Sequence, residues 1–235
     1  DISCHCALGS MAQVLHACGV DIASELPWVK PWFLRYQMAD GGLSCDETAY
    51  RVVDQCPSSM VGTIAPFEAM LVLASTPEEH QFVERAATFL VQRGLVRGSD
   101  TTHNAEERDA APAWMQHCFP RLYFYDVLRG LDALVRWAAG SLDRRIPALV
   151  LEPVIRHLVA AYPDGVVRVE RRAFRGIGSI AQSPHGTGWI RQPVAATFPL
   201  LELASMPGTP SLAGTRSWNE TRQRLRDLAA RGQLA

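Results

Sequence analysis

Helices that are apolar on all sides alternate along this chain with helices that have one polar face. The pattern predicts the first kind near residues 6–18, 58–74, 123–139 and 195–204, and the second kind near 27–38, 77–93, 146–161 and 218–231. A helix that is apolar all round must be buried, whereas an amphipathic helix covers a core with one face. Each pair takes roughly 50 to 65 residues, and repeats on this scale indicate a helical array.

An array with apolar inner helices and amphipathic outer helices predicts an all-α fold of the α/α-toroid type, either closed or open at one side. An open solenoid is the alternative. Capping boxes at Thr76–Glu79 and Ser217–Glu220 mark two helix starts, and Pro66 is expected to kink or split its helix. Residues 166–170 alternate in polarity and are expected to form a short strand or an extended loop.

The junction after the first amphipathic segment has an unusual order: a helix that reaches Gln37, then Asp40-Gly41-Gly42, then the large apolar residue Leu43. The two glycines can adopt positive φ, so the helix can stop abruptly and the chain can turn back. This order resembles the repeat shared by squalene-type terpenoid cyclases and protein prenyltransferase β subunits. The resemblance implies a single toroid domain over residues 1–235, with four helix pairs where those families have six or seven.

Bulk composition is that of an ordinary globular protein, with 48% hydrophobic and 20% charged residues. A net charge of −1 offers no attraction for nucleic acid, and no apolar run is long enough to span a membrane. The six cysteines show no framework spacing, so we expect them to be reduced and the protein to be cytoplasmic. The start at Asp1 lacks an initiator Met, and we expect an upstream segment to be missing.

The first candidate cluster, Cys45-Asp46-Glu47, follows the Gly-Gly turn. In the resembled families this end of the toroid holds either a zinc ion or the acid that protonates the substrate. The resemblance therefore makes Cys45 and Asp46 candidate catalytic and metal-binding residues. Neither family pattern is reproduced, because the Cys and the Asp are adjacent here. The local alternative is that Asp46 caps the next turn while Cys45 packs beneath it.

A second cluster, Cys4-His5-Cys6, lies at the predicted start of the first inner helix. Thiolate and imidazole groups are preferred ligands of Zn²⁺. Neighbouring residues diverge on a helix, so a site would take one or two of these side chains and add Cys45 or Asp46. We favour His5, Cys45 and Asp46 as the metal ligands, with zinc as the metal. The alternative is an ordinary helix start.

The third cluster precedes the longest inner helix and runs from His117 to Asp126. Asp126 stands roughly where the resembled prenyltransferases place a zinc-binding His, so it is a candidate catalytic residue, metal ligand or helix cap. Tyr123 and Tyr125 are expected to line an apolar cavity, where aromatic faces stabilise cations. His185, in a glycine-rich loop, is a third candidate substrate-binding residue. Ordinary packing of these aromatic residues is the alternative.

Two hypotheses follow for the function. In the first, the protein is a transferase or cyclase that acts on an apolar, isoprenoid-like substrate in the central cavity, with zinc as a candidate cofactor. In the second, the same fold is a binding or scaffold module whose cavity is packed or holds a lipid. Fold alone does not decide between them, because proteins of one fold can carry different functional sites.

Overall fold

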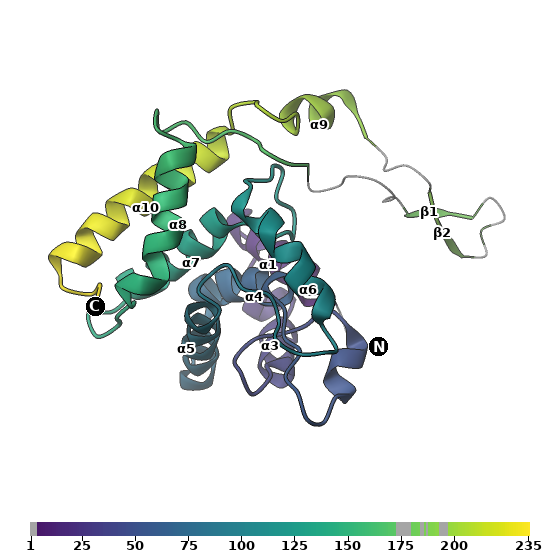
Figure 1. Cartoon of the computed structure of the whole chain (residues 1–235). Helices are drawn as coiled ribbons and strands as arrows, with labels where there is room; N and C mark the ends of the chain where they lie inside the picture. The colour runs from purple at the N-terminus through teal and green to yellow at the C-terminus, as the bar shows by residue number, and fades with distance from the viewer. Residues whose placement is uncertain (1–3, 173–179, 184–185, 187, 193–196) are drawn as a thin grey trace.

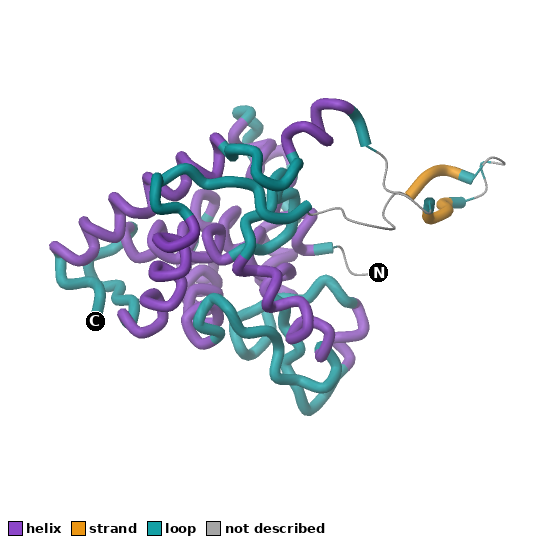
Figure 2. Tube along the Cα trace, turned by 45° about the horizontal axis from the view of Figure 1, so that its top comes forward, coloured by secondary structure: helices purple, strands orange, loops and turns teal. Residues whose placement is uncertain are grey.

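The computed structural model describes residues 4–172, 180–183, 186, 188–192 and 197–235 (Figure 1). The protein is all-α in class, and Figure 2 shows that helices and loops make up its body. The sheet found in the described part of the chain is one antiparallel hairpin, β1 (Ile180–Gln182) and β2 (Trp189–Arg191), which lies away from the helices. Across the described residues, no helix combines the length and the apolar character that crossing a membrane requires.

Four helices follow one another as packed neighbours. They are α1 (His5–Ala17), α4 (Met60–Leu73), α7 (Val127–Ala139) and α10 (Leu212–Ala230). The closest approach is between α1 and α4, where Gly9 leaves no room for a side chain. A Cβ at Gly9 would lie 2.4 Å from the carbonyl carbon of Ala65. Three of these helices come from segments predicted to be inner, whereas α10 comes from the segment predicted to be the last outer helix, so the predicted alternation does not extend to the fourth pair.

The remaining long helices flank this row. They are α3 (Val29–Tyr36), α5 (Pro77–Gln92) and α8 (Ala148–Ala161). The helix α5 packs against α3, α4 and α7, while α8 packs against α7. The predicted capping box is present at α5, where the hydroxyl of Thr76 accepts a hydrogen bond from the backbone N–H of Glu79, and the Glu79 carboxylate accepts one from the backbone N–H of Thr76.

A buried ion pair joins three helices of the row, α1, α4 and α7. The guanidinium of Arg129 on α7 lies 2.6 Å from the carboxylate of Glu68 on α4. The amide of Gln13 on α1 donates to the same carboxylate at 3.3 Å. A charged pair inside a core is tolerated only when its remaining polar atoms are also bonded, as they are here. This contact fixes the register of α1, α4 and α7 relative to one another.

Several expectations about individual helices need correction. The first helix is not buried all round, because Met11 and Val14 are 61% and 62% exposed on the side of α1 that faces away from α4. The last apolar segment forms only the short α9 (Pro199–Ala204), which has no buried residue. Pro66 does not split its helix, since α4 is continuous from Met60 to Leu73.

The start of α10 also differs from the prediction. Ser217 lies inside the helix, and the N-cap is Ser211, whose hydroxyl accepts a hydrogen bond from the N–H of Gly214. Residues 166–170 form an extended segment with an isolated bridge from Arg168 to Pro210, which is the second of the two forms predicted for them. Four short helical segments that the sequence pattern missed complete the fold: α2 (Ile22–Glu25), η1 (Glu47–Arg51), α6 (Ala105–Ala110) and η2 (Ala111–Met115).

Candidate metal centre

Three thiol groups converge at the start of α1. The sulfur atoms of Cys4, Cys6 and Cys45 all lie within 4.8 Å of one another. The Sγ atoms of Cys4 and Cys6 are 3.0 Å apart, and the backbone N–H of Cys6 donates to the Sγ of Cys45 at 3.2 Å. Sulfur ligands at 2.3 Å from one tetrahedral zinc ion are about 3.8 Å apart. Small side-chain movements would therefore place all three sulfurs around one ion.

The Asp-Gly-Gly turn positions Cys45. Gly41 adopts φ +90°, and a Cβ there would lie 2.2 Å from the carbonyl oxygen of Arg85. The amide of Gln37 donates to the carbonyl oxygens of Gly41 and Phe82, both at 2.9 Å, which ties the turn to α5. Leu43 is then fully buried and pairs with Ser59 at the start of α4. The chain therefore passes under α1 with Cys45 facing the helix start.

The environment favours a thiolate at the exposed member of the cluster. Hydrogen bonds from Cys45 and Cys6 lower the pKa of Cys4 below its ordinary value. The pKa values of Cys6 and Cys45 are raised, mainly because each hydrogen-bonds to Cys4. The partial positive charge of a helix N-terminus also favours a negative sulfur. Cys6 is buried and Cys45 half-buried, whereas Cys4 is exposed to solvent.

His5 supports the position of Cys45 but does not belong to the group of three thiols. Its Nδ1 lies 2.7 Å from the carbonyl oxygen of Ser44, so the ring bonds the backbone just before Cys45. The imidazole is fully buried, with Tyr36 and Tyr50 at centroid distances of 5.5 and 5.8 Å. Burial lowers the pKa of His5, so the ring stays neutral. Among the described residues, its Nε2 has no hydrogen-bond partner.

Asp46 points to a different partner. Its carboxylate accepts a hydrogen bond from the N–H of Thr48 and caps η1, as the local alternative expected. It also lies 2.8 Å from Nε2 of His103, which forms a surface Asp–His pair beside the cluster. Partial burial raises the pKa of Asp46, but hydrogen bonds from His103 and Thr48 outweigh this and hold it below its usual range. Within the described residues, the thiol group therefore includes neither Asp46 nor His5.

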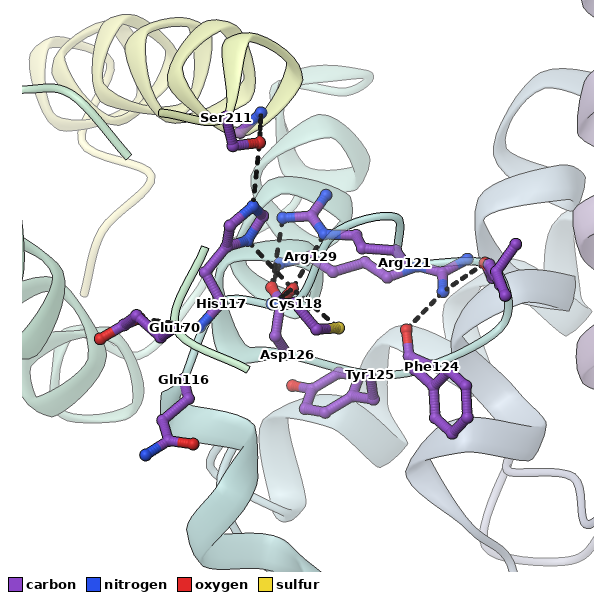
Figure 3. Close-up of polar contacts among 12 residues, drawn as sticks. Gln116, His117, Cys118, Arg121, Phe124, Tyr125, Asp126, Arg129, Glu170 and Ser211 are labelled. Carbon is purple, nitrogen blue, oxygen red and sulfur yellow. Dashed lines mark hydrogen bonds and ion pairs between the residues drawn. The ribbon is translucent and has the colours of Figure 1, made fainter. Parts of the chain in front are cut away.

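Asp126 lies in a separate, buried polar network (Figure 3). Its carboxylate caps α7 by accepting from the N–H of Arg129 at 2.9 Å. It also lies 2.9 Å from Nε of Arg121 and 3.2 Å from Nδ1 of His117. Burial raises the pKa of Asp126, yet Arg121 and His117 more than compensate and hold it well below its usual range. Asp126 therefore carries a fixed negative charge.

The order Ser211, His117, Asp126 in this network matches that of a hydrolase triad, because Nε2 of His117 lies 3.2 Å from the hydroxyl of Ser211. The accessibility does not match, since these three residues are 3%, 2% and 1% exposed. The Ser211 hydroxyl is also occupied as the cap of α10. A nucleophile must reach its substrate, so we interpret the network as a link between α7 and α10.

The two tyrosine candidates lie in different surroundings. Tyr125 is fully buried and donates its hydroxyl proton to the carbonyl oxygen of Leu95 at 2.8 Å, so it packs inside the protein. Tyr123 is 39% exposed and stacks on Phe124 with a centroid distance of 4.5 Å. Burial raises the pKa of Tyr123, and nearby Cys6, Cys4 and Cys45 raise it further, which places this ring beside the thiol cluster. His185 lies outside the described residues.

Of the ligands predicted from the sequence, only Cys45 belongs to the group, and Cys4 and Cys6 take the places predicted for His5 and Asp46. The signal that favours the cysteines is their Cys-x-Cys spacing across a helix start, which lets the first residue lie outside the helix. Comparison of the chain with protein-family models, with curated proteins and with solved structures gives no match. The arguments for function therefore rest on the site itself.

Proposed function

We propose that this protein binds one Zn²⁺ ion through Cys4, Cys6 and Cys45 and leaves the fourth coordination position to an exogenous ligand. The observation that carries the proposal is the convergence of three sulfur atoms within 4.8 Å from segments that are 39 residues apart in sequence. Thiolates are ligands that zinc prefers, and the sulfurs are already close to the separation that a tetrahedral zinc ion requires.

The fourth position is the feature that distinguishes a catalytic site from a structural one. Structural zinc sites have four protein ligands, whereas catalytic sites keep three and hold water or substrate in the remaining position. Within the described part of the chain, no fourth His, Cys, Asp or Glu belongs to the group. Cys4 is exposed, so the open side faces solvent.

The class of reaction that this arrangement supports best is transfer to, or cyclisation of, an apolar substrate. Bound zinc would supply a Lewis acid. Two exposed apolar side chains, those of Leu122 and Tyr123, provide a surface beside the cluster for an isoprenoid-like group. The row α1, α4, α7 and α10 with its flanking helices supports a partial α/α toroid as the framework.

Elemental analysis of the purified protein tests the metal proposal. We expect one zinc per chain, and we expect Cys4→Ser, Cys6→Ser and Cys45→Ser each to lower zinc affinity at least tenfold. Matched controls are Cys18→Ser and Cys56→Ser, because these two thiols are free and lie outside the group. Zinc contents that are equal in all five variants, or a wild-type protein without zinc, would reject the proposal.

Turnover of a panel of isoprenoid diphosphates tests the reaction class. Asp46→Asn removes the charge of the carboxylate that pairs with His103, and we expect it to lower turnover while zinc content is unchanged. Asp54→Asn, at an exposed position, is the control. If neither wild type nor control shows turnover, the transferase and cyclase proposal is wrong for this substrate class.

One observation favours the binding module as a second candidate. A groove along α8 is lined by eight residues, six of them aliphatic: Ala148, Leu151, Ile155, Val159, Ala160 and Leu234, with Glu152 and Arg156 completing it. Native mass spectrometry should then detect a retained apolar molecule. Val159→Asp should lower its retention, and equal retention in both proteins would contradict binding at this groove.

A further inference from the structure

We propose that Cys4 is a redox modification site, at which a hydroperoxide oxidises the thiolate and Cys6 then closes a disulfide. Two of the three thiols would thereby be withdrawn from metal binding. The zinc-release part of this inference rests on the proposed function, whereas the disulfide part rests only on the positions of the sulfurs.

Accessibility selects Cys4 as the thiol that is attacked. Cys4 is exposed, Cys45 is half-buried and Cys6 is 2% exposed, so peroxide in solution meets Cys4 first. Oxidants in solution react first with the thiols that they can reach. A sulfenic acid at this position would lie directly against a second sulfur, which is the usual arrangement in redox-sensing sites.

Distance and chain geometry select Cys6 as the resolving thiol. The Sγ atoms of Cys4 and Cys6 are 3.0 Å apart, and a disulfide needs about 2.05 Å. Cys4 is the N-cap of α1 and has an extended backbone with φ −65° and ψ 101°, so it can move without unwinding a helical turn. Cys45 follows the Asp-Gly-Gly turn, and its sulfur accepts a hydrogen bond from the backbone of Cys6.

The chemistry balances with one hydroperoxide per disulfide. The Cys4 thiolate attacks an oxygen of hydrogen peroxide, the O–O bond breaks, and the leaving hydroxide takes a proton to become water. The sulfur of Cys6 then attacks the sulfur of the sulfenic acid and forms the S–S bond, while the proton of the Cys6 thiol passes to the departing hydroxide, which leaves as water. Two thiols lose two electrons in total, and one peroxide is reduced to two molecules of water.

The consequence for the metal centre follows from ligand count. With Cys4 and Cys6 joined, only Cys45 remains of the group, and a single thiolate does not hold zinc tightly. We therefore expect one zinc ion to leave for each disulfide formed. A dithiol reductant should regenerate the three thiols and restore binding.

The test treats the full chain with one equivalent of hydrogen peroxide, in both zinc-loaded and chelator-stripped form. Differential alkylation and peptide mapping identify the oxidised cysteines, while a chromogenic chelator measures released zinc. We expect a Cys4–Cys6 disulfide in both forms, and release of one zinc per disulfide from the loaded form. In Cys6→Ser we expect a sulfenic acid at Cys4 that dimedone traps.

Cys18 provides the internal control, because it is an exposed thiol outside the cluster. Oxidation of Cys18 at the same rate as Cys4, or a mapped disulfide that includes Cys45 instead of Cys6, would overturn the inference. The disulfide in a protein that binds no zinc would reject the proposed function and leave this inference standing. Bound zinc with Cys4 and Cys6 still reduced after peroxide would reject this inference and leave the proposed function standing. Peptide mapping of the wild-type protein shows which cysteines form the disulfide, even if Cys6→Ser does not fold.

Discussion

At the scale of single residues, two buried carboxyl groups show how neighbouring side chains determine the charge of an acidic residue. Asp126 lies between Arg121 and His117, which hold its pKa below the usual range despite burial. Glu107 lies 3.9 Å from Arg93 and accepts a hydrogen bond from the N–H of Met60, but burial outweighs both and raises its pKa to about 7. The first is a permanent anion, whereas the second changes its charge near neutral pH.

Glu107 should make the stability of the protein depend on pH. A carboxyl whose pKa is raised on folding stabilises the folded state when protonated, and this contribution is lost as the pH rises from about 4.3, the ordinary value, to about 7. We expect the free energy of unfolding to fall by about 2 kcal/mol between pH 5 and pH 8. Urea denaturation followed by circular dichroism measures this fall.

The variant Glu107→Gln removes this ionisation and should flatten that pH dependence. Its amide oxygen can still accept the hydrogen bond from the backbone N–H of Met60. Glu106→Gln, at the exposed neighbouring position, is the control and should keep the slope of the wild type. The same slope in all three proteins would mean that Glu107 is ionised throughout this range.

Asp126→Asn should destabilise the protein by about 3 kcal/mol at pH 7, because it leaves the guanidinium of Arg121 partly buried without its anion. The lowered pKa means that the charged carboxylate contributes above about pH 4 and that this contribution is lost as the pH falls below that. The urea midpoint measures the loss, with exposed Asp143→Asn as the control. A shift no larger than that of the control would show that the network does not stabilise the α7–α10 contact.

At the scale of helices, the close contact of α1 and α4 supports both stability and the thiol cluster. Gly9 lies on α1 directly opposite Ala65 and Pro66, and the same helix carries Cys6 one turn earlier. The position of one sulfur therefore depends on how closely two helices approach each other.

Gly9→Ala should push these helices apart, because its Cβ would lie 2.4 Å from backbone atoms of α4. Overpacking of this kind costs about 1–3 kcal/mol. We expect a lower melting temperature together with weaker zinc binding, measured by competition with a chelator of known affinity. In Gly188→Ala, where a Cβ would have no atom of the described residues within 4 Å, both quantities should be unchanged. A stable Gly9→Ala protein with wild-type zinc affinity would contradict the coupling.

Helix bounds were predictable where local signals dominate. The segments that became α4, α5 and α8 end within about two residues of the prediction, because caps and glycines set them. The start of α10 was not predictable in this way. The capping box at Ser217 is a valid local signal, but Ser211 also bonds His117, a contact that joins residues 94 positions apart. Tertiary contacts of this kind leave no periodic trace in the sequence.

At the scale of the whole molecule, the sequence predicted the helical class and one member of the thiol cluster, Cys45, but not the other two, Cys4 and Cys6. Cys4 and Cys6 lie beside Cys45 only because α1 packs on α4 and the Asp-Gly-Gly turn returns beneath it. The residues preferred from sequence, His5 and Asp46, are adjacent to the ligands along the chain, and their side chains bond Ser44 and His103 instead. The toroid remains a prediction, which the row of neighbouring helices supports.

The central claim is that three cysteines hold one zinc ion and leave one position open. X-ray absorption at the zinc K-edge of the purified protein tests this directly, because it counts the ligands of each element around the metal. The account predicts three sulfur atoms at about 2.3 Å and one nitrogen or oxygen atom at about 2.0 Å. A shell of nitrogen and oxygen atoms alone, or four sulfur atoms, would contradict it.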